Sequence, residues 1–341
     1  MTPSPAPPSP RPLDILSTDA GYRQRFFDAD YWTPYVRWVV WKQFGVRNAA
    51  VRSGLAGTYP TFIADDRWVV KFFGDLFEGE ATHAAELCVG LLRPERHGIP
   101  APALLAHDDM YDAPGQWRWP YLVFEFMEGG SIGEAGDSVS HGDRVRIARE
   151  VAGMTRALHT VPIPADGPFD ASWGAYEALI ACQRAQCVEN HREWGDLPDH
   201  LIAQIDYYLA PTEELIDRGR PPHLIHADIT ADHILGLVEA ARWRTTALID
   251  FGDAMVGGHL YELVALHLDV FRGDTALLAA YLDAYGVDVA FHAALPRLAL
   301  STCLLHRFDV FASLAAIVGD VDEVASLEML ADTLWAMPTG H

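Results

Sequence analysis

The sequence predicts an α+β protein in which a small antiparallel sheet is followed by a larger, mainly helical region. Residues 51–74 alternate between apolar and polar side chains around short turns, a pattern typical of antiparallel strands. Apolar residues recur at helical spacing in residues 144–159, and further helical patterns occupy residues 175–219 and 274–337. At 341 residues, the chain is long enough for one domain of two lobes or for two small domains.

Three parts are expected along the chain. Residues 1–17 should form a disordered tail, because six prolines fall within the first 13 residues. Residues 18–128 should form an N-terminal lobe that begins with helices, including an aromatic helix that ends near Gly45. Residues 129–341 should form a helical C-terminal lobe, with the boundary where a strand pattern ends at Gly129 and Gly130.

The composition bears on the class of partner. Half of the residues are hydrophobic and 21% are charged, as in a globular protein. The net charge of −22 argues against a nucleic-acid partner, because phosphate contacts need clustered Lys and Arg. An acidic surface could attract a cationic substrate, although acidic residues also serve solubility.

Cysteine usage and hydropathy indicate the compartment. The four cysteines form no CxxC pair and no cluster with His, so we interpret them as reduced thiols. The sequence has no signal-peptide pattern and no apolar stretch of the roughly 18 residues that a membrane helix needs. We therefore expect a soluble cytoplasmic protein without a membrane partner, present as a monomer or a homodimer.

A lysine is the conspicuous residue of the N-terminal lobe. The chain has only two lysines, and Lys71 lies within the aromatic and aliphatic strand pattern of residues 67–73. A lysine in such a strand must reach the sheet edge or meet an anion, because an unpaired buried ammonium is costly. The helix predicted over residues 78–93 offers two acids as partners, Glu86 and Glu80.

Two carboxylates stand at the ends of strand-like runs in the C-terminal lobe. Asp228 follows the apolar residues 224–225, and Asp250 closes the run of residues 246–249. Residues 234–238 lie between them and are interpreted as one arm of a hairpin. Two carboxylates at paired strand ends suit phosphoryl transfer, in which one orients the attacking hydroxyl and the other holds Mg²⁺ on nucleotide phosphates.

Together these motifs resemble the aminoglycoside phosphotransferase and choline kinase family. The family's catalytic loop has the pattern His-x-Asp-x-x-x-x-Asn, and residues 226–233 read His-Ala-Asp-Ile-Thr-Ala-Asp-His. The next strand ends in Asp-Phe-Gly-Asp at residues 250–253, also as in the family. The resemblance, which extends over roughly residues 51–268, implies a protein-kinase-like fold of two lobes with ATP or GTP bound between them.

The resemblance also implies which residues bind the nucleotide. The N-terminal lobe would carry these residues, which are Lys71, Glu86, Gly57, Thr58, Glu125 and Met127. Lys71 would contact the phosphates and Glu86 would hold it, whereas Glu80 stays open as the alternative partner. The glycine turn would approach the phosphates, and the segment that joins the lobes would contact adenine through its backbone.

The remaining site residues are expected in the C-terminal lobe, together with the substrate site. Asp228 would be the catalytic residue, and Asp250 and His233 would be metal ligands. His233 departs from the family, because Mg²⁺ prefers hard oxygen ligands and the family has Asn at this position. Three interpretations stay open: His233 binds metal through nitrogen, Asp232 takes over, or only one metal is held firmly.

We therefore predict an ATP- or GTP-dependent, Mg²⁺-dependent O-phosphotransferase that acts on a hydroxyl of a small molecule. The first guess for the acceptor is an aminoglycoside-like antibiotic, which would make the chain an antibiotic-resistance enzyme. A metabolic kinase for choline, an amino alcohol or a sugar is the alternative. Because the family's Asn is missing, a nucleotide-binding pseudokinase also stays open.

Overall fold

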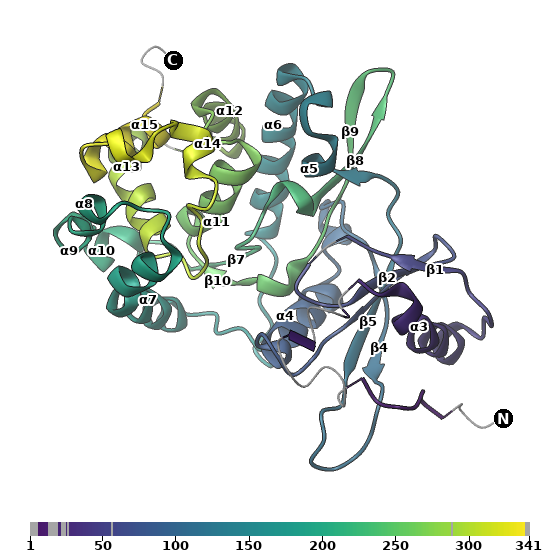
Figure 1. The fold of residues 1–341 in the computed structure, drawn as a ribbon. Helices are drawn as coiled ribbons and strands as arrows, with labels where there is room; N and C mark the ends of the chain where they lie inside the picture. The colour runs from purple at the N-terminus through teal and green to yellow at the C-terminus, as the bar shows by residue number, and fades with distance from the viewer. Residues whose placement is uncertain are drawn as a thin grey trace. The chain divides into compact units, whose positions relative to one another are not determined.

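The computed structural model describes residues 6–12, 20–21, 25, 27–55, 57–287 and 289–337, with the backbone alone for residues 289–293. The chain divides into two compact units, whose elements are labelled in Figure 1. The first, which we call the N-unit, comprises Met1–Arg96, Ala101–Glu128 and Ile249–Gly252 as far as they are described. The second, the C-unit, comprises His97–Pro100, Gly129–Leu248 and Asp253–His341 to the same extent.

The N-unit is built on an antiparallel sheet with the strand order β1-β2-β3-β5-β4. Its strands are β1 (Val51–Ser53), β2 (Thr61–Ala64), β3 (Trp68–Phe72), β4 (Leu104–Asp109) and β5 (Pro120–Glu125). Helix α3 (Ala29–Phe44) covers one face of the sheet, where the ring of Trp32 stacks on that of Phe72 at 4.9 Å. Because side chains alternate along a strand, Lys71 points to the other face, toward α4 (Gly79–Leu92).

Part of the expected tail packs on the N-unit. The carbonyl of Pro10 accepts a hydrogen bond from the Tyr35 hydroxyl at 2.7 Å, and that of Pro8 accepts one from the Tyr111 hydroxyl at 2.9 Å. Residues 1–5 and 13–17 lie outside the described residues, so the disorder expected over residues 1–17 stays a prediction.

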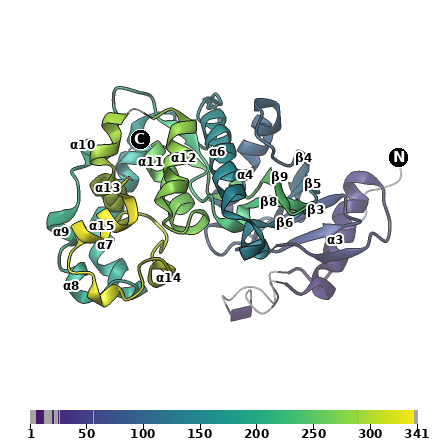
Figure 2. The same cartoon turned by 90° about the horizontal axis from the view of Figure 1, so that it is seen from above.

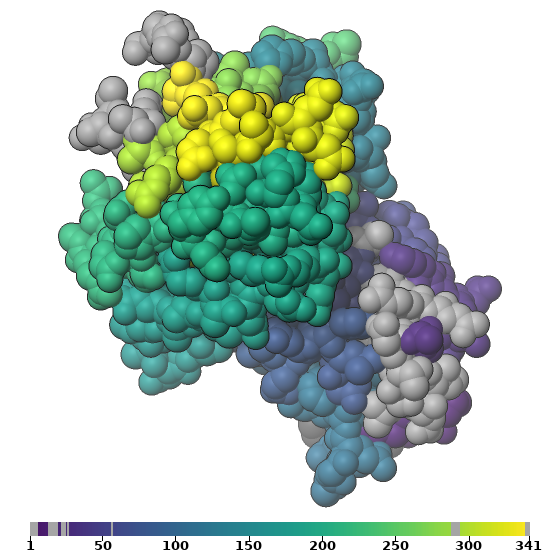
Figure 3. Space-filling view, turned by 60° about the vertical axis from the view of Figure 1, so that its left-hand side comes forward, coloured from purple at the N-terminus to yellow at the C-terminus, as the bar shows by residue number. Residues whose placement is uncertain are grey.

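The C-unit is mainly helical. Its helices are α5 (Ile132–Ala135), α6 (His141–Leu158), α7 (Trp173–Trp194), α8 (Asp199–Ile202), α9 (Ile205–Tyr208), α10 (Thr212–Leu215), α11 (His259–Ala265), α12 (Thr275–Tyr285), α13 (Val289–Leu304), α14 (Leu314–Val318) and α15 (Leu327–Trp335). Helices α6 and α12 run side by side in both ribbon views (Figures 1 and 2). In Figure 3, the teal to green surface of α7–α10 lies against the yellow C-terminal helices of the same unit.

Short strands and turns of the C-unit position its polar residues. The hairpin expected around residues 234–249 is present as β8 (Ile234–Glu239) and β9 (Arg242–Leu248), with β6 (Gly130–Ser131) on the outer side of β8. Strand β7 (His223–Ile225) pairs with β10 (Met255–Gly257). The chain also has short helical turns. They are η1 (Pro94–His97), η2 (Gly136–Ser138), η3 (Ala231–His233), η4 (Phe251–Asp253), the π-turn η5 (Leu266–Val270) and η6 (Val321–Glu323).

The α+β class expected from the sequence is confirmed, and one helical pattern is broken more often than expected. Within the helical pattern of residues 175–219, the part after α7 is divided into the short helices α8, α9 and α10, because Pro198 and Pro211 interrupt it at two helix starts. In the part of the chain that is described, no helix combines the length and apolar character that crossing a bilayer requires.

Candidate active site

A buried lysine with two carboxylate partners forms the polar centre of the N-unit. The Lys71 Nζ lies 2.8 Å from Glu86 Oε2 and 2.7 Å from Asp250 Oδ1. Side-chain exposure is only 7% for Lys71 and 6% for Glu86, so this ion pair is shielded from water. Burial alone would lower the pKa of Lys71, but the charges of Asp250 and Glu86 outweigh it and raise the pKa above its usual value. The ammonium is therefore permanently charged.

The other acid of α4 has a different partner. Glu80 Oε1 lies 2.7 Å from Arg118 Nη2, and this hydrogen bond lowers the pKa of Glu80. The Glu80 side chain is 58% exposed, whereas Glu86 points from the same helix into the interior. The structure thus pairs Lys71 with Glu86 and not with Glu80.

The turn that carries Asp250 has an unusual backbone. Asp250 adopts a left-handed conformation with φ 62°, which is uncommon for a residue other than glycine and is typical of functional turns. Two residues later, a Cβ on Gly252 would lie 2.7 Å from Thr82 Cγ2 of α4, so any larger residue there would force Thr82 to shift. A Cβ on Gly57 would lie 3.8 Å from Asp250 Oδ2, which places the backbone of the glycine turn beside this carboxylate.

These residues fit Mg²⁺ held mainly by nucleotide phosphates. Asp250 supplies the hard oxygen donors that Mg²⁺ prefers, and the residue beside its carboxylate, Gly57, has no side chain. Over the described residues, no group of three or more His, Cys, Asp or Glu side chains forms a site made by protein alone. Such a site is not required, since Mg²⁺ in phosphotransferases binds through one or two carboxylates together with phosphate oxygens.

The other expected nucleotide residues lie apart from this cluster. Thr58 is exposed in the turn after Gly57, and Met127 is half-buried in the segment after β5. Glu125 ends β5 opposite Trp68, and its N–H donates to the carbonyl of Ala103 at 2.9 Å. Thr58, Glu125 and Met127 make no described hydrogen bond or ion pair with Lys71, so their contact with a nucleotide stays a prediction.

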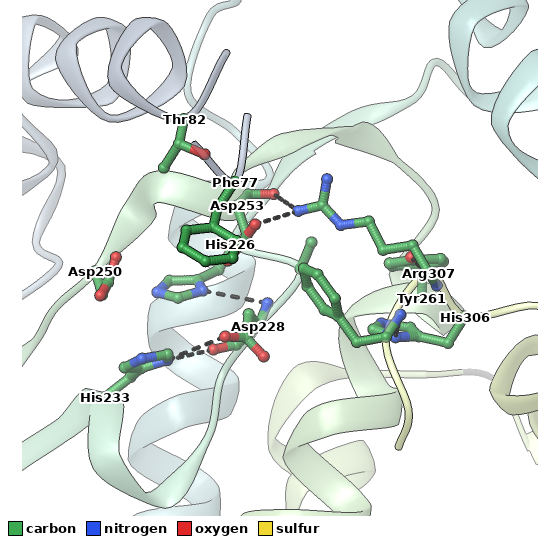
Figure 4. Close-up of polar contacts among 12 residues, drawn as sticks. Phe77, Thr82, His226, Asp228, His233, Asp250, Asp253, Tyr261, His306 and Arg307 are labelled. Atoms are coloured by element: carbon green, nitrogen blue, oxygen red, sulfur yellow. Dashed lines mark hydrogen bonds and ion pairs between the residues drawn. The ribbon is translucent and has the colours of Figure 1, made fainter. Parts of the chain in front are cut away.

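In the C-unit, a tight loop after β7 presents Asp228 (Figure 4). The Asp228 N–H donates to Nδ1 of the fully buried His226 at 3.4 Å. Between them, Ala227 has a left-handed backbone with φ 66°. His226 therefore supports the loop through a hydrogen bond.

A buried glutamate fixes this loop from below. Glu262 of α11 accepts the N–H of His226 at 3.1 Å through Oε1 and the N–H of Ala227 at 2.7 Å through Oε2. Burial raises the pKa of Glu262 to about 7, although the two hydrogen bonds act in the opposite direction. The side chain of Glu262 therefore holds the backbone of the loop at two adjacent residues.

His233 lies beside Asp228 at the end of the same loop. Its Nδ1 is 2.6 Å from the carbonyl oxygen of Asp228, and since a carbonyl only accepts, Nδ1 carries the hydrogen. In the neutral ring, Nε2 then keeps the lone pair that a metal would need. Asp232 instead accepts a hydrogen bond from the Ser131 hydroxyl at 2.9 Å. The nitrogen-ligand interpretation of His233 is therefore chemically available.

One polar group near this loop was not singled out from the sequence. Arg307 follows α13, and its Nη2 donates to Asp253 Oδ1 at 2.5 Å and to the Asp253 carbonyl at 3.1 Å (Figure 4). The Arg307 N–H donates to the buried Tyr261 hydroxyl at 3.2 Å. The only signal in the sequence was an arginine two residues after the apolar residues 303–305.

Comparison with protein families identifies the class. The phosphotransferase enzyme family, abbreviated APH, matches residues 57–300, which is more than half of the chain. The chain belongs to this family. The family resemblance expected from the motifs at residues 226–233 and 250–253 is thereby confirmed.

Two curated relatives match over part of their length. The chain is 24% identical over 297 residues to lysine-specific demethylase JMJ21 of Arabidopsis thaliana, a match that covers 71% of this chain and 31% of that protein. It is 28% identical over 196 residues to homoserine kinase of Methylobacterium sp. (strain 4-46), covering 54% of this chain and 55% of that one. This chain thus spans about a third of the first relative and about half of the second.

Solved structures share the fold. The GDP complex of aminoglycoside 2'-phosphotransferase-IIIa superposes with a TM-score of 0.62 at 19% identity, covering 90% of this chain and 98% of that one. A streptomycin-ATP-APH(2")-IIa ternary complex gives 0.57 at 17% identity, covering 89% and 98%. A microcompartment-associated aminopropanol kinase gives 0.52 at 16% identity, covering 86% and 91%. The expected kinase-like fold is therefore confirmed.

Proposed function

We propose that this chain transfers the γ-phosphoryl group of ATP or GTP to a hydroxyl group of a small molecule. The observation that carries the proposal is the buried Lys71, whose ammonium is held by Glu86 and Asp250 at 2.8 and 2.7 Å. A permanently charged, fixed ammonium suits a nucleotide phosphate, which is the role of the corresponding lysine in kinases. Membership of the phosphotransferase enzyme family supports the same reaction.

Each residue would have a distinct role. Lys71 would position the nucleotide phosphates while Glu86 keeps it in place. Asp250 would hold Mg²⁺, with His233 as a candidate second ligand, and Mg²⁺ when bound neutralises charge on the phosphates. Asp228 would orient the acceptor hydroxyl and receive its proton as the new P–O bond forms and the bond between the β–γ bridging oxygen and the γ-phosphorus breaks.

The acceptor is the open part of this proposal. An aminoglycoside-like antibiotic is the first candidate, because several structures with this fold are named for that activity. A small metabolic acceptor is the second candidate, since one of the two relatives reported above is a homoserine kinase and one protein with a similar fold is an aminopropanol kinase. The retained Lys71, Asp228 and Asp250 argue against a pseudokinase, although His233 replaces the family's Asn.

The test is nucleotide turnover that depends on an acceptor. Purified protein is incubated with ATP or GTP, Mg²⁺ and a panel of hydroxylated amines, amino acids and aminoglycosides, and released ADP or GDP is measured. We expect turnover above background with at least one acceptor and a phosphorylated product by mass spectrometry. Nucleotide binding without turnover across the panel would favour the pseudokinase instead.

A further inference from the structure

Arg307 and Asp253 form an ion pair that remains accessible to water at the C-unit. The Arg307 side chain is 25% exposed and that of Asp253 is 31% exposed, in contrast to the sealed Lys71–Glu86 pair. Both residues are charged and partly exposed, and they belong to the same unit as Asp228. Such a pair can be reached by a solute, and each member can exchange its partner for a group of that solute.

The guanidinium of Arg307 is only partly used. Among the described residues, its hydrogen bonds to Asp253 involve Nη2 alone, and the buried Nε–H has no acceptor. An unmatched buried donor is costly, at about 1–3 kcal/mol, and often marks a place where a ligand or water completes the site. The Phe308 ring lies 4.7 Å from the guanidinium carbon and is 39% exposed, so it limits one side of the group.

The ion pair is close to the catalytic loop. The backbone N–H of Arg307 donates to the Tyr261 hydroxyl. The residue after Tyr261 is Glu262, which holds the loop backbone. Burial raises the pKa of the Tyr261 hydroxyl, and the charges of Arg307, Asp253 and Asp228 act on this pKa to a smaller extent. Figure 4 shows these residues around one region of the C-unit. Arg307, Asp253 and the proposed catalytic residue Asp228 are therefore all close enough to the Tyr261 hydroxyl to interact with it electrostatically.

An adjacent cation and anion complement a zwitterion. A carboxylate recognised by arginine takes two of its N–H groups in a planar fork, and an ammonium is recognised by a carboxylate. A polycation would be attracted by the Asp253 carboxylate but repelled by the Arg307 guanidinium. An aminoglycoside has no anionic group that could neutralise the charge of Arg307. An amino alcohol would leave Arg307 without a matching group.

We propose that the Arg307–Asp253 pair is an acceptor subsite, in which Arg307 binds a carboxylate and Asp253 an ammonium. The acceptor class is then a hydroxylated amino acid, whose hydroxyl is directed toward Asp228. This inference rests on the proposed phosphotransferase function and selects among its acceptors. It assigns Arg307 a role in specificity, not in the chemical step.

Three matched acceptors test the subsite without any mutation. L-Homoserine carries both charges, 3-aminopropan-1-ol lacks the carboxylate, and 4-hydroxybutyrate lacks the ammonium. Wild-type protein should phosphorylate homoserine with a kcat/KM about 10-fold or more above that of either analogue, because each charged hydrogen bond contributes on the order of 10-fold or more. Equal use of 3-aminopropan-1-ol, or a preference for kanamycin over all three, would overturn the subsite while leaving the phosphotransferase function intact.

Variants then separate recognition from structure. Arg307→Gln should raise the KM for homoserine about 10-fold or more, leave the KM for ATP unchanged, and abolish the advantage of homoserine over 3-aminopropan-1-ol. Arg307→Lys should keep part of that advantage. Arg297→Gln is the matched control, because Arg297 forms an exposed ion pair with Glu214 at 2.9 Å in the same unit. An equal loss for all acceptors in Arg307→Gln would show that Arg307 is merely structural. Absence of turnover with every acceptor would instead contradict the proposed function.

Discussion

Lys71 is the residue on which the proposed binding of the nucleotide depends. The buried Glu86 and the half-buried Asp250 both contact it, so removing Lys71 leaves negative charge without compensation, at a cost of about 3–5 kcal/mol. Lys71→Ala should therefore lower the free energy of unfolding and raise the KM for ATP. The KM for the acceptor should hardly change, and a change in that constant alone would contradict the phosphate role of Lys71.

The two acids of α4 provide a matched comparison. Glu86→Gln should reduce kcat/KM for ATP, because the neutral amide no longer fixes the Lys71 ammonium. Glu80→Gln changes the same chemistry at an exposed position that contacts Arg118, and we expect it to lie within about 2-fold of wild type. Steady-state kinetics of the two variants decide the assignment, and a larger loss in Glu80→Gln would reverse it.

His233 is the residue at which this chain departs from its family. If its Nε2 binds metal, a nitrogen ligand should favour Mn²⁺ over Mg²⁺ relative to an oxygen ligand. His233→Asn should then lower the ratio of Mn²⁺-supported to Mg²⁺-supported activity, with activity in Mg²⁺ retained or improved. An identical ratio in both proteins would remove His233 from the metal site and leave Asp250 as the ligand.

At the scale of elements, α11 determines the geometry of the catalytic loop. Glu262→Ala would leave the N–H groups of His226 and Ala227 buried without acceptors, at about 1–3 kcal/mol each. We expect a lower free energy of unfolding in urea and a reduced kcat with little change in the KM for ATP. Glu328→Gln on the exposed face of α15 is the control. A similar loss of stability and kcat in that variant would argue that the contact of Glu262 with the catalytic loop is unimportant.

Local patterns predicted the elements well where each pattern was regular. The alternation in residues 59–64 and 67–73 corresponds to β2 and β3, and the helix expected over residues 78–93 is α4. Helix α6 begins at His141, three residues earlier than expected, because Ser140 caps it by accepting the N–H of Asp143 at 3.1 Å. Caps depend on single side chains, which a periodic pattern does not weigh.

The site was predictable where residues carry a motif and not where they meet through the fold. Lys71 was found because a lysine in an apolar strand needs an anion. Its choice of Glu86 over Glu80 depends on how α4 is rotated against the sheet, which the sequence left open. Arg307 was missed because its partner Asp253 lies 54 residues away and a single arginine after a helix has no distinctive spacing.

At the scale of the whole molecule, buried histidines should make the fold sensitive to acid. Burial lowers the pKa of His83 and His267 to about 4 and that of His259 and His306 to about 3. Below pH ~6.5, the unfolded chain therefore takes up protons that the folded protein does not, and stability is lost as the pH falls. Glu262 and Asp309, whose pKa values are raised to about 7 and about 6, act in the opposite direction, but such carboxyl groups are fewer than the buried histidines.

Thermal unfolding measured from pH 7 to pH 5 at constant ionic strength checks this expectation. The midpoint should fall steadily over this range, and His306→Asn should flatten the dependence by removing one of these histidines. A midpoint that stays constant or rises toward pH 5 would show that these histidines are already protonated in the folded protein.

Asp228 is the proposed catalytic residue of an active phosphotransferase. The most direct measurement is acceptor-dependent ADP release by wild type and Asp228→Asn, together with the Kd for ATP of both proteins. We expect the variant to lose about 10²- to 10⁴-fold in kcat while its Kd for ATP stays within a few-fold of wild type. Unchanged turnover in Asp228→Asn would contradict the account.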